Sequence, residues 1–449
     1  MASAYLHRTN GTATNSQKMT FSTWFKIGTG AAQKSLFGSV TGSGPYTQVK
    51  IMQLATHNNV FRFEASSIEG NAIDLKTNRV FRDPGAWYHL VVAIDTTQVS
   101  SSDRAKIYIN GVQETSFATS TYPTQNDTLD FSASGVVAQV MAYNNTEHWD
   151  GTFAHTHFID GLQYAASIFG ETDSTSGIWV GKPSPSVTYG TNGFFLKYAS
   201  GAITTDSSGN GNTMTQVGTI TTTKDSPDNN FCTMNPLDNY YAQYTFSNGN
   251  NTITNTGSKG FASATVSLFK GLWYWEIKPT AQPGGAYSLI GIADVPTQGT
   301  GASNYLGYTA LEWAYYASDG NSRNNQASTS YGDTWTTDDI IGVYLDLDAN
   351  KLYFAKNGTI QNSGTGISIT AVGSTTNGFY FPATGYNDTS ASVYQHNFGN
   401  GYFGTDLIAS ASADAGGEGQ FKYNPSTGTF DGSSKDFRAI CVNNIATYG

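Results

Sequence analysis

Two carboxylate residues at alternate positions are the first candidates for chemistry in this sequence. Glycoside hydrolysis needs two carboxyl groups a few ångströms apart, and residues two apart on a strand share a face. Glu171 and Asp173 have this spacing, but they follow Phe169-Gly170 in a polar segment and precede Ser174-Thr175-Ser176, where a further acid would be wanted. We therefore predict that the protein is not an enzyme and has no catalytic residue.

Two histidines form the nearest approach to a metal site. His155 and His157 lie two apart on an expected strand, so their side chains share one face of a sheet. A closed zinc site needs four ligands, usually histidine and cysteine, and the two cysteines of the chain are far apart in sequence. We expect no metal at these histidines and no disulfide.

A stretch rich in aromatic, amide and arginine side chains lies between residues 313 and 335. Aromatic rings offer an apolar platform with a polar edge, and aromatic and arginine anchors carry much of the energy of many interfaces. Because Asp319-Gly320-Asn321 is typical of a turn, we interpret the stretch as a loop that presents these side chains. The candidate ligand-binding residues are Trp313, Tyr315, Tyr316, Arg323 and Tyr331.

The elements that would position these residues are β-strands. The 449 residues include 49 glycines, 13% are aromatic and only 12% are charged, which is a β-rich composition. Short apolar alternations are broken by Gly, Asn, Ser and Thr, as expected for antiparallel strands and turns. Asn110-Gly111 fits a tight hairpin. The clearest strands of the first half are expected at 20–27, 48–53, 60–65, 87–95, 106–110 and 152–159.

The second half repeats the first in outline. A hydrophobic strand, a turn and an aromatic strand ending in Asn-Gly occur at 87–111 and again at 340–358. Two sandwiches of related design are the economical explanation. We expect the first at 1–181 and the second at 239–405, joined by a Pro/Gly/Asn-rich connector with a hairpin at 182–238. A C-terminal tail follows at 406–449, with a flexible stretch at 409–417 and a last strand that docks at 436–442.

The charge distribution and the apolar runs limit the partners. The chain has 23 lysine and arginine residues and 33 aspartate and glutamate residues, which give a net charge of -10. It has no cluster of basic residues that could neutralise the phosphates of a nucleic acid. Nucleic acid is therefore not expected as a partner. The longest apolar run, residues 90–94, is far shorter than a membrane span of about 18 residues, so no membrane insertion is expected. The N-terminus has no charged start followed by an apolar stretch, so we expect no signal peptide.

The N-terminal half resembles the laminin G-like branch of the concanavalin A-like jelly rolls. The residues that carry this resemblance cover most of 1–180. They are Thr20-Phe21-Ser22-Thr23-Trp24-Phe25-Lys26, Trp87-Tyr88-His89-Leu90-Val91-Val92, Lys106-Ile107-Tyr108-Ile109-Asn110-Gly111 and Asp150-Gly151-Thr152-Phe153. Laminin G-like modules often hold calcium, so the resemblance leaves a calcium ion open, although no calcium motif of fixed spacing is readable.

The C-terminal half is similar to a SPRY domain, which is a second concanavalin A-like sandwich. This match is the more specific of the two, and SPRY domains often use the region of Arg323 for partners. Its marks are Gly271-Leu272-Trp273-Tyr274-Trp275-Glu276-Ile277, Leu289-Ile290-Gly291-Ile292-Ala293, Ile341-Gly342-Val343-Tyr344-Leu345-Asp346, Leu352-Tyr353-Phe354-Ala355-Lys356-Asn357-Gly358 and Phe381-Pro382-Ala383.

The pairing of these two domains looks like a class of large phage virion proteins, described as tail-fibre, head-fibre or other structural components. Three further segments add to this resemblance, one before the first sandwich, one at its end and one in the connector. They are Tyr5-Leu6-His7-Arg8-Thr9, His157-Phe158-Ile159-Asp160-Gly161 and Asp206-Ser207-Ser208-Gly209-Asn210-Gly211-Asn212. The composition is that of a cysteine-poor β protein suited to the cell exterior, yet we expect no export signal. A virion protein would combine these two features, because it is made in the host cytoplasm and released by lysis.

The fold class that follows is all-β, with two concanavalin A-like jelly-roll sandwiches. The expected function is a non-enzymatic virion protein that presents lectin-like sandwiches for attachment to a host-surface glycan or protein. One alternative is an assembly component that binds only other virion proteins, and another is a free lectin or glycan hydrolase. A homo-oligomer, with a trimer favoured, would give repeated binding sites.

Overall fold

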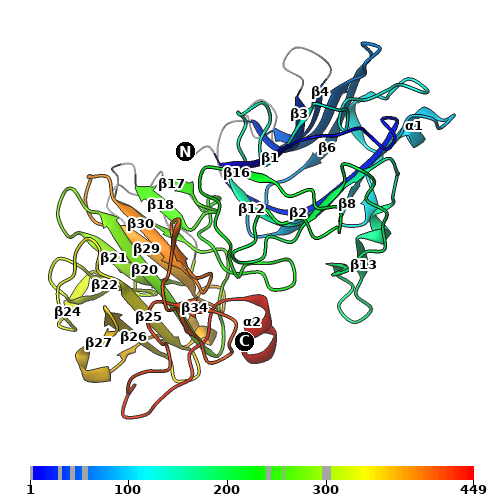
Figure 1. Ribbon diagram of the computed structural model, residues 1–449. Coiled ribbons are helices and arrows are strands. Elements are labelled where there is room, and N and C mark those ends of the chain that lie inside the picture. Colours follow the sequence, from blue (N-terminus) through cyan, green and yellow to red (C-terminus); the bar gives the residue numbers. More distant parts are fainter. Residues whose placement is uncertain are drawn as a thin grey trace. The chain divides into compact units, whose positions relative to one another are not determined.

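The chain forms two β-sandwiches. The computed structural model describes residues 4–28, 33–40, 46–52, 59–238, 244–255, 257, 259–295 and 305–449. It divides into two compact units, Met1–Thr222 and Thr223–Gly449. Each unit contains an eight-stranded sheet and a six-stranded sheet (Figure 1). The expected all-β class with two sandwiches is confirmed.

The first unit pairs an eight-stranded sheet of order β10-β6-β5-β4-β3-β11-β1-β16 with a six-stranded sheet of order β15-β12-β2-β7-β8-β9. A two-stranded hairpin, β13-β14, is separate from both sheets. The elements are β1 (Tyr5–Thr9), β2 (Lys18–Ile27), β3 (Gln33–Val40), β4 (Tyr46–Met52), β5 (Val60–Ser66), β6 (Ala72–Val80), β7 (Trp87–Asp95), α1 (Ser101–Arg104), β8 (Ala105–Ile109), β9 (Val112–Gln113), β10 (Phe117–Thr121), β11 (Val137–Val140), β12 (Gly151–Asp160), η1 (Ala166–Ile168), β13 (Gly170–Thr172), β14 (Trp179–Gly181), β15 (Phe194–Leu196) and β16 (Thr215–Val217).

The strands expected in the first half occur within two residues of their expected bounds. The alternation in β2 explains why, because Phe21, Phe25 and Ile27 lie in one apolar core between the sheets. Asn110 and Gly111 have φ angles of 48° and 79° in the turn from β8 to β9. These left-handed conformations are those of the tight hairpin that Asn-Gly favours.

The second unit has the same two-sheet design. Its eight-stranded sheet, called sheet J here, contains β17-β18-β30-β20-β25-β26-β27 with β28 also paired to β26, and its six-stranded sheet K has the order β19-β29-β21-β22-β23-β24. The elements are β17 (Tyr244–Ser247), β18 (Thr252–Asn255), β19 (Gly260–Ser263), β20 (Leu272–Ala281), β21 (Ser288–Ala293), β22 (Glu312–Tyr316), β23 (Ser322–Asn324), β24 (Ala327–Thr329), β25 (Ile341–Asp346), β26 (Lys351–Lys356), β27 (Thr359–Ile360), η2 (Asn362–Gly364), β28 (Ile367–Ser368), η3 (Val372–Ser374), β29 (Phe381–Tyr386), β30 (Val393–Asn397), β31 (Tyr402–Phe403), β32 (Asp406–Leu407), β33 (Ser412–Ala413), β34 (Gln420–Phe421) and α2 (Val442–Tyr448).

The segment expected to be a separate connector, 182–238, is divided between the two units at Thr222. Its strands do not form a hairpin with each other, because β15 pairs with β12 and β16 pairs with β1. Phe194 and Leu196 enter the core of the first sandwich. The connector is therefore built into the first sandwich up to residue 222, since its apolar side chains are buried there.

The C-terminal tail, 406–449, packs on the second sandwich. Phe421, Phe430 and Phe437 are fully buried in a cluster on sheet J. The backbone N–H of Tyr274 donates to the carbonyl of Arg438 at 2.8 Å, so the end of the chain pairs with β20. Residues 436–442 do dock, but through isolated bridges at Arg438 and Cys441 and not as a strand. The expectation of a flexible stretch at 409–417 is wrong, because β33 in that stretch pairs with β34 and buried aromatic residues follow it.

Neither cysteine forms a disulfide, and both thiols are buried. Cys232 lies in the core between the sheets, whereas Cys441 lies in the cluster that covers the outer face of sheet J. Burial raises the pKa of the Cys441 thiol to about 11. Among the described residues, no helix is long and apolar enough to cross a membrane.

Candidate functional site

The aromatic stretch between residues 313 and 335 is not a loop. Trp313, Tyr315 and Tyr316 lie on strand β22, which pairs with β21 on one side and β23 on the other. The expectation of a loop is wrong because β22 alternates inward and outward side chains, and the turn begins only at Ala317. The stretch therefore contains a strand followed by a hairpin.

Three of the five candidate residues belong to the core of the second sandwich. Trp313, Tyr315 and Tyr331 are buried between the sheets. The hydroxyl of Tyr315 donates to the carbonyl of Asp333, and the hydroxyl of Tyr331 accepts the backbone N–H of Phe354 at 3.0 Å. Burial raises the pKa of both phenols well above its usual value. These side chains cannot contact a ligand while the sandwich is folded.

The other two candidates, Tyr316 and Arg323, contact each other on the outer side of sheet K. The guanidinium of Arg323 lies 4.6 Å from the centre of the Tyr316 ring, within the range of a cation–π contact. Arg323 also forms an ion pair with Asp319 and donates to the hydroxyl of Ser328. Its side chain is only 12% exposed. Arg323 is thus fixed by three neighbours.

These contacts hold the base of an exposed hairpin formed by β23 and β24. β24 is the edge strand of sheet K and all three of its residues are exposed. The turn residues Asn325 and Gln326 adopt φ angles of 50° and 62°, which are uncommon for residues other than glycine. Asn324 donates through its amide to the carbonyls of Ala310 and Glu312 at 3.0 and 2.8 Å. The hairpin presents a backbone edge with hydroxyl and amide side chains.

The two histidines considered for metal binding pack as aromatic side chains. His157 is buried, stacks on Phe195 with 3.9 Å between ring centres, and its Nδ1 lies 2.9 Å from the hydroxyl of Tyr189. Burial lowers the pKa of His157 well below its usual value. His155 sits in a bulge of β12 with a φ of 46° and contacts the same Phe195. Within the described ranges, no group of three potential metal ligands occurs.

A third histidine, His89, was not selected from the sequence and is buried. His89 on β7 accepts a hydrogen bond from the indole of Trp179 at Nδ1, 3.0 Å away. Its Nε2 lies 2.9 Å from the hydroxyl of Ser22 and therefore donates to it. Burial lowers the pKa of His89 to about 3. The imidazole stays neutral and holds the β13-β14 hairpin against the six-stranded sheet.

The two acids considered for catalysis are held apart from any shared reaction centre. Glu171 lies on β13 with a side chain that is 62% exposed, and its nearest cation is Lys182 at 3.5 Å. Asp173 caps the following turn, where one of its oxygens accepts hydrogen bonds from Ser176 and Thr175. The ion pair of Glu171 and the hydrogen bonds of Asp173 are typical of a hairpin at the protein surface.

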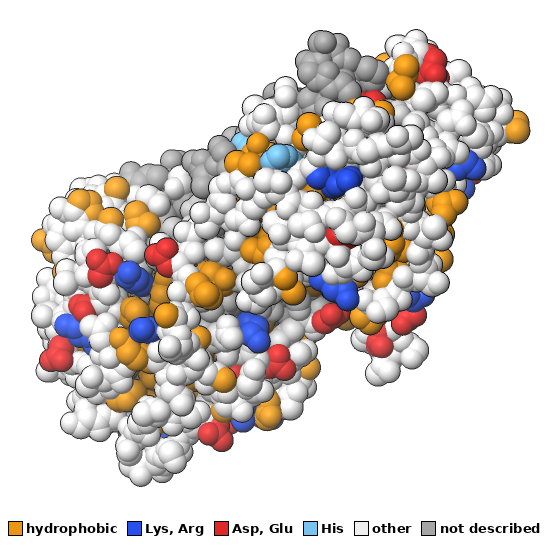
Figure 2. Space-filling model, in the orientation of Figure 1, with side chains coloured by type: hydrophobic (Ala, Val, Ile, Leu, Met, Phe, Trp, Pro, Cys, Tyr) orange, Lys and Arg blue, Asp and Glu red, His pale blue; other side chains and the backbone are white. Residues whose placement is uncertain are grey.

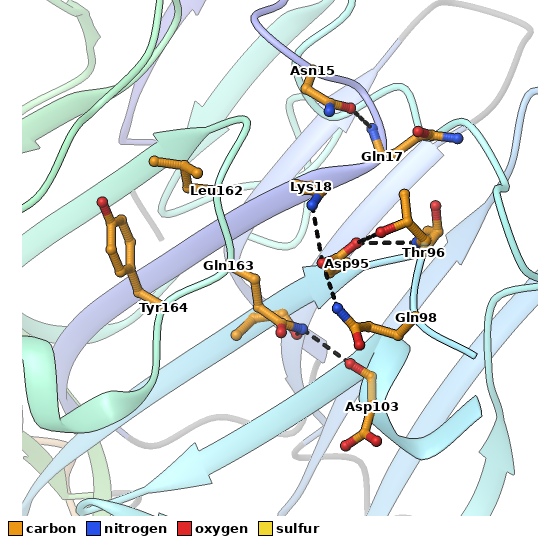
Figure 3. Close-up of polar contacts among 12 residues, drawn as sticks. Asn15, Gln17, Lys18, Asp95, Thr96, Gln98, Asp103, Leu162, Gln163 and Tyr164 are labelled. Atoms are coloured by element: carbon orange, nitrogen blue, oxygen red, sulfur yellow. Dashed lines mark hydrogen bonds and ion pairs between the residues drawn. The ribbon is translucent and has the colours of Figure 1, made fainter. Parts of the chain in front are cut away.

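A polar patch of the first unit was missed by the sequence reasoning. Three segments converge there, from the start of β2, the end of β7 and the chain after β12 (Figure 3). Lys18 forms an ion pair with Asp95 at 3.1 Å, and the amide of Gln98 donates to the same carboxylate at 2.8 Å. Burial alone would raise the pKa of Asp95, but these hydrogen bonds and those from Thr97 outweigh it and lower the pKa.

Side-chain amides surround this ion pair. Gln163 donates to the carbonyls of Ala93 and Asp103 at 3.2 and 3.1 Å. In the described part of the chain, no hydrogen bond reaches the amide oxygen of Gln163 or Gln98. Leu162, which is 39% exposed, lies beside Gln163 (Figure 3). No sequence signal marks this patch, because its residues come from three distant segments.

Charge on the surface is sparse. On the face shown in Figure 2, lysine and arginine side chains occur singly or in small groups beside acidic ones, among uncharged polar atoms. This agrees with a charged fraction of 12%. The expectation that nucleic acid is not a partner stays a prediction.

Two family matches follow the division of the chain. Residues 2–169 match the concanavalin A-like lectin/glucanases superfamily, and residues 272–401 match the SPRY domain. The chain therefore carries a laminin G-like, concanavalin A-like domain followed by a SPRY domain. Such domains are typically non-catalytic binding domains.

Curated relatives match the SPRY part. Ran-binding protein 9 of Xenopus tropicalis is 30% identical over 138 residues, which are 30% of this chain and 23% of that protein. Ran-binding protein 10 of Danio rerio is 25% identical over 181 residues, which are 40% of this chain and 27% of that protein. The chain thus spans about a quarter of the length of these relatives.

Solved structures with similarity include the SPRY domain of human HERC1 and stonustoxin. The first is 19% identical with a TM-score of 0.29 and covers 36% of this chain and 96% of that chain. The second is 19% identical with a TM-score of 0.29 and covers 37% of this chain and 27% of that chain.

Proposed function

We propose that the chain is a non-catalytic recognition protein whose SPRY sandwich binds a protein partner through the β23-β24 hairpin. The observation that carries this proposal is the exposed edge strand β24, held at its base by the contacts of Arg323 with Tyr316 and Asp319. An open strand edge offers unpaired backbone groups to an extended segment of another chain. Arg323 keeps this edge in place, because its guanidinium is held by Asp319, Ser328 and the Tyr316 ring.

The family matches favour a protein over a sugar as the partner of this sandwich. SPRY domains are generally protein-interaction domains, and the relatives of this part are named Ran-binding proteins. The identity of the partner of this chain is not implied by those names. What carries over is the kind of ligand, a folded protein or an extended peptide segment.

The setting that we propose is a phage virion, in which the chain belongs to a head or tail fibre or a related structural component. The support is the resemblance carried by the order of the two domains along the chain. A homotrimer is the favoured assembly, because repeated sites raise the strength of attachment. Purified particles should contain the chain, and light scattering of the isolated protein should give three times the mass of one chain. A monomeric mass, or particles without the chain, would count against this setting.

Site-specific photocrosslinking tests the hairpin as the binding surface. A photoreactive residue in place of Ser328 on β24 should yield one dominant crosslinked protein when the full chain is added to the particles or cells from which it comes. The matched control places the same group at Asn377, an exposed residue far from β24 in sequence. Equal labelling at both positions would reject the hairpin.

The polar patch of the first unit supports a second candidate function, binding of a neutral sugar. Amide oxygens of Gln98 and Gln163 are held in place because the nitrogen of each amide already donates to the protein. Fixed acceptors beside a lysine and an exposed leucine suit a ligand with many hydroxyl groups and an apolar face.

Saturation-transfer NMR with galactose, glucose and N-acetylglucosamine tests this second candidate. A sugar that binds should lose at least half of its signal in Gln98→Ala and Gln163→Ala, and keep it in Gln216→Ala, which changes an exposed glutamine of β16. Signal that is equal in all three variants would exclude this patch as a sugar site.

A further inference from the structure

We propose that the C-terminal segment, residues 406–449, is a pH-sensitive cover over an aromatic face of the SPRY sandwich, with Glu276 as the group that senses pH. This inference goes beyond the recognition function and does not rest on it. The family match ends at residue 401, before this segment begins.

The segment covers the outer face of sheet J. Alternation along β20, β25 and β26 sends one set of side chains into the core and the other set outward. The outward set is aromatic, and phenylalanines of the C-terminal segment pack on it with ring centres 4.7 to 5.2 Å apart. The contacting pairs are Tyr274–Phe421, Tyr344–Phe430, Tyr344–Phe437 and Tyr353–Phe430.

Glu276 lies on the same outward face and is completely buried under the segment. Its carboxylate accepts the backbone N–H groups of Lys422 and Tyr423 at 2.9 and 2.8 Å. It also accepts the amide of Asn397 at 3.1 Å and the hydroxyl of Tyr274 at 3.0 Å. Two of its four donors therefore belong to the cover.

No cation compensates this buried carboxylate among the described groups that face it. β20 contributes the Tyr274 phenol and β30 the Asn397 amide. β25 contributes the Tyr344 phenol, and the cover contributes backbone N–H groups and the Tyr423 phenol. The side chain of Lys422 points to solvent, as its exposure shows. Burial raises the pKa of Glu276 to about 7, and the four hydrogen bonds lower it by less.

The direction of the pH effect follows from linkage. When the cover opens, water reaches Glu276 and its pKa returns toward the usual 4.5. The closed state then binds the proton more tightly than the open state. Closure is thus strongest below about pH 4.5 and weakens as the pH rises to about 7, where the effect levels off. Within this window the opening constant should rise about tenfold per pH unit.

Hydrogen exchange of the full chain between pH 4.5 and 7.5 tests this inference. Amides of residues 420–441, after correction for their intrinsic exchange rates, should show an opening constant that rises about tenfold per pH unit. Amides of β25 should report a rarer opening at every pH. Opening of the cover that is independent of pH, or that always coincides with β25, would overturn the proposal.

Two variants separate Glu276 from general effects of pH. Glu276→Gln keeps the shape but removes the titrating group, so the slope of opening against pH should vanish. Glu312→Gln is the matched control, because Glu312 is another buried glutamate whose pKa is raised but which binds the loop at residues 307–309. This control should keep the slope. The same slope in Glu276→Gln as in the parent would reject Glu276 as the sensor.

A direct measurement remains available if Glu276→Gln does not fold. The carboxyl carbon of Glu276 in the parent protein, labelled with ¹³C-glutamate, should titrate near pH 7. Titration at the usual value near 4.5 would overturn the proposal without any variant.

Discussion

The guanidinium of Arg323 stands 4.6 Å from the ring centre of Tyr316, and the two side chains come from adjacent strands of sheet K. The pair lies seven residues apart in sequence and closes the base of the β23-β24 hairpin. The geometry makes Arg323 a fixed group at the edge of the sheet, with its donors directed to Asp319 and Ser328.

Replacing Arg323 should weaken partner binding more than folding. Arg323→Ala removes one cation–π contact and one ion pair at a partly exposed position, so the free energy of unfolding should fall by about 1 kcal/mol. Urea denaturation measures this loss, and crosslinking at position 328 measures binding. Arg323→Lys should restore stability better than binding, because lysine lacks the planar fork. A loss well above this size would indicate a purely structural residue.

Removing one phenylalanine of the C-terminal segment should destabilise the second unit strongly. Phe430 is fully buried and contacts three aromatic rings. Phe430→Ala should lower the free energy of unfolding by about 3–5 kcal/mol. Leu407→Ala is the control, since Leu407 is 64% exposed, and it should change stability little. Equal effects in both variants would contradict a docked segment.

Acid should destabilise the protein through its enclosed histidines. Burial lowers the pKa of His89 and of His396 to about 3, whereas unfolded histidine titrates near 6.5. The unfolded chain therefore binds more protons below about pH 6.5, and stability should fall as the pH drops toward 3. Imidazole ¹⁵N spectra should show both rings neutral at pH 5. A charged ring at that pH would contradict the enclosure of that histidine.

No glycan hydrolysis should be detectable. The full chain incubated with laminarin and agar should release no reducing sugar, because Glu171 is exposed and Asp173 caps a turn. Glu171→Gln should also leave the unfolding temperature unchanged within about 1 °C, as expected for an exposed ion pair. Turnover that this variant abolishes would show the protein to be an enzyme.

The sequence by itself determined the clearest strands of the first sandwich and the repeated strand–turn–strand pattern at 340–358 of the second. Period-two alternation in residues 20–27 and the Asn110-Gly111 turn depend on neighbours along the chain, so they are readable without a structure. The same holds for the similarity of the two halves, which both contain an eight- and a six-stranded sheet. The family resemblances gave the order of the two domains for the same reason, because they rest on contiguous motifs.

Only the tertiary structure decided on which face of sheet K each aromatic side chain lies, since Tyr315 and Tyr316 are both buried but in different clusters. Tyr315 and Tyr316 are adjacent in sequence, yet the first is in the core and the second contacts Arg323. The Asp319-Gly320-Asn321 turn made the whole stretch resemble a loop, whereas pairing with β21 makes its first part a strand.

The same holds for Glu276, which the sequence marked only as part of the motif at residues 271–277. It is buried because Lys422 and Tyr423, 146 and 147 residues further along the chain, donate to its carboxylate. Burial of a charge depends on which distant segment packs over it, and nothing in the neighbouring residues records that segment.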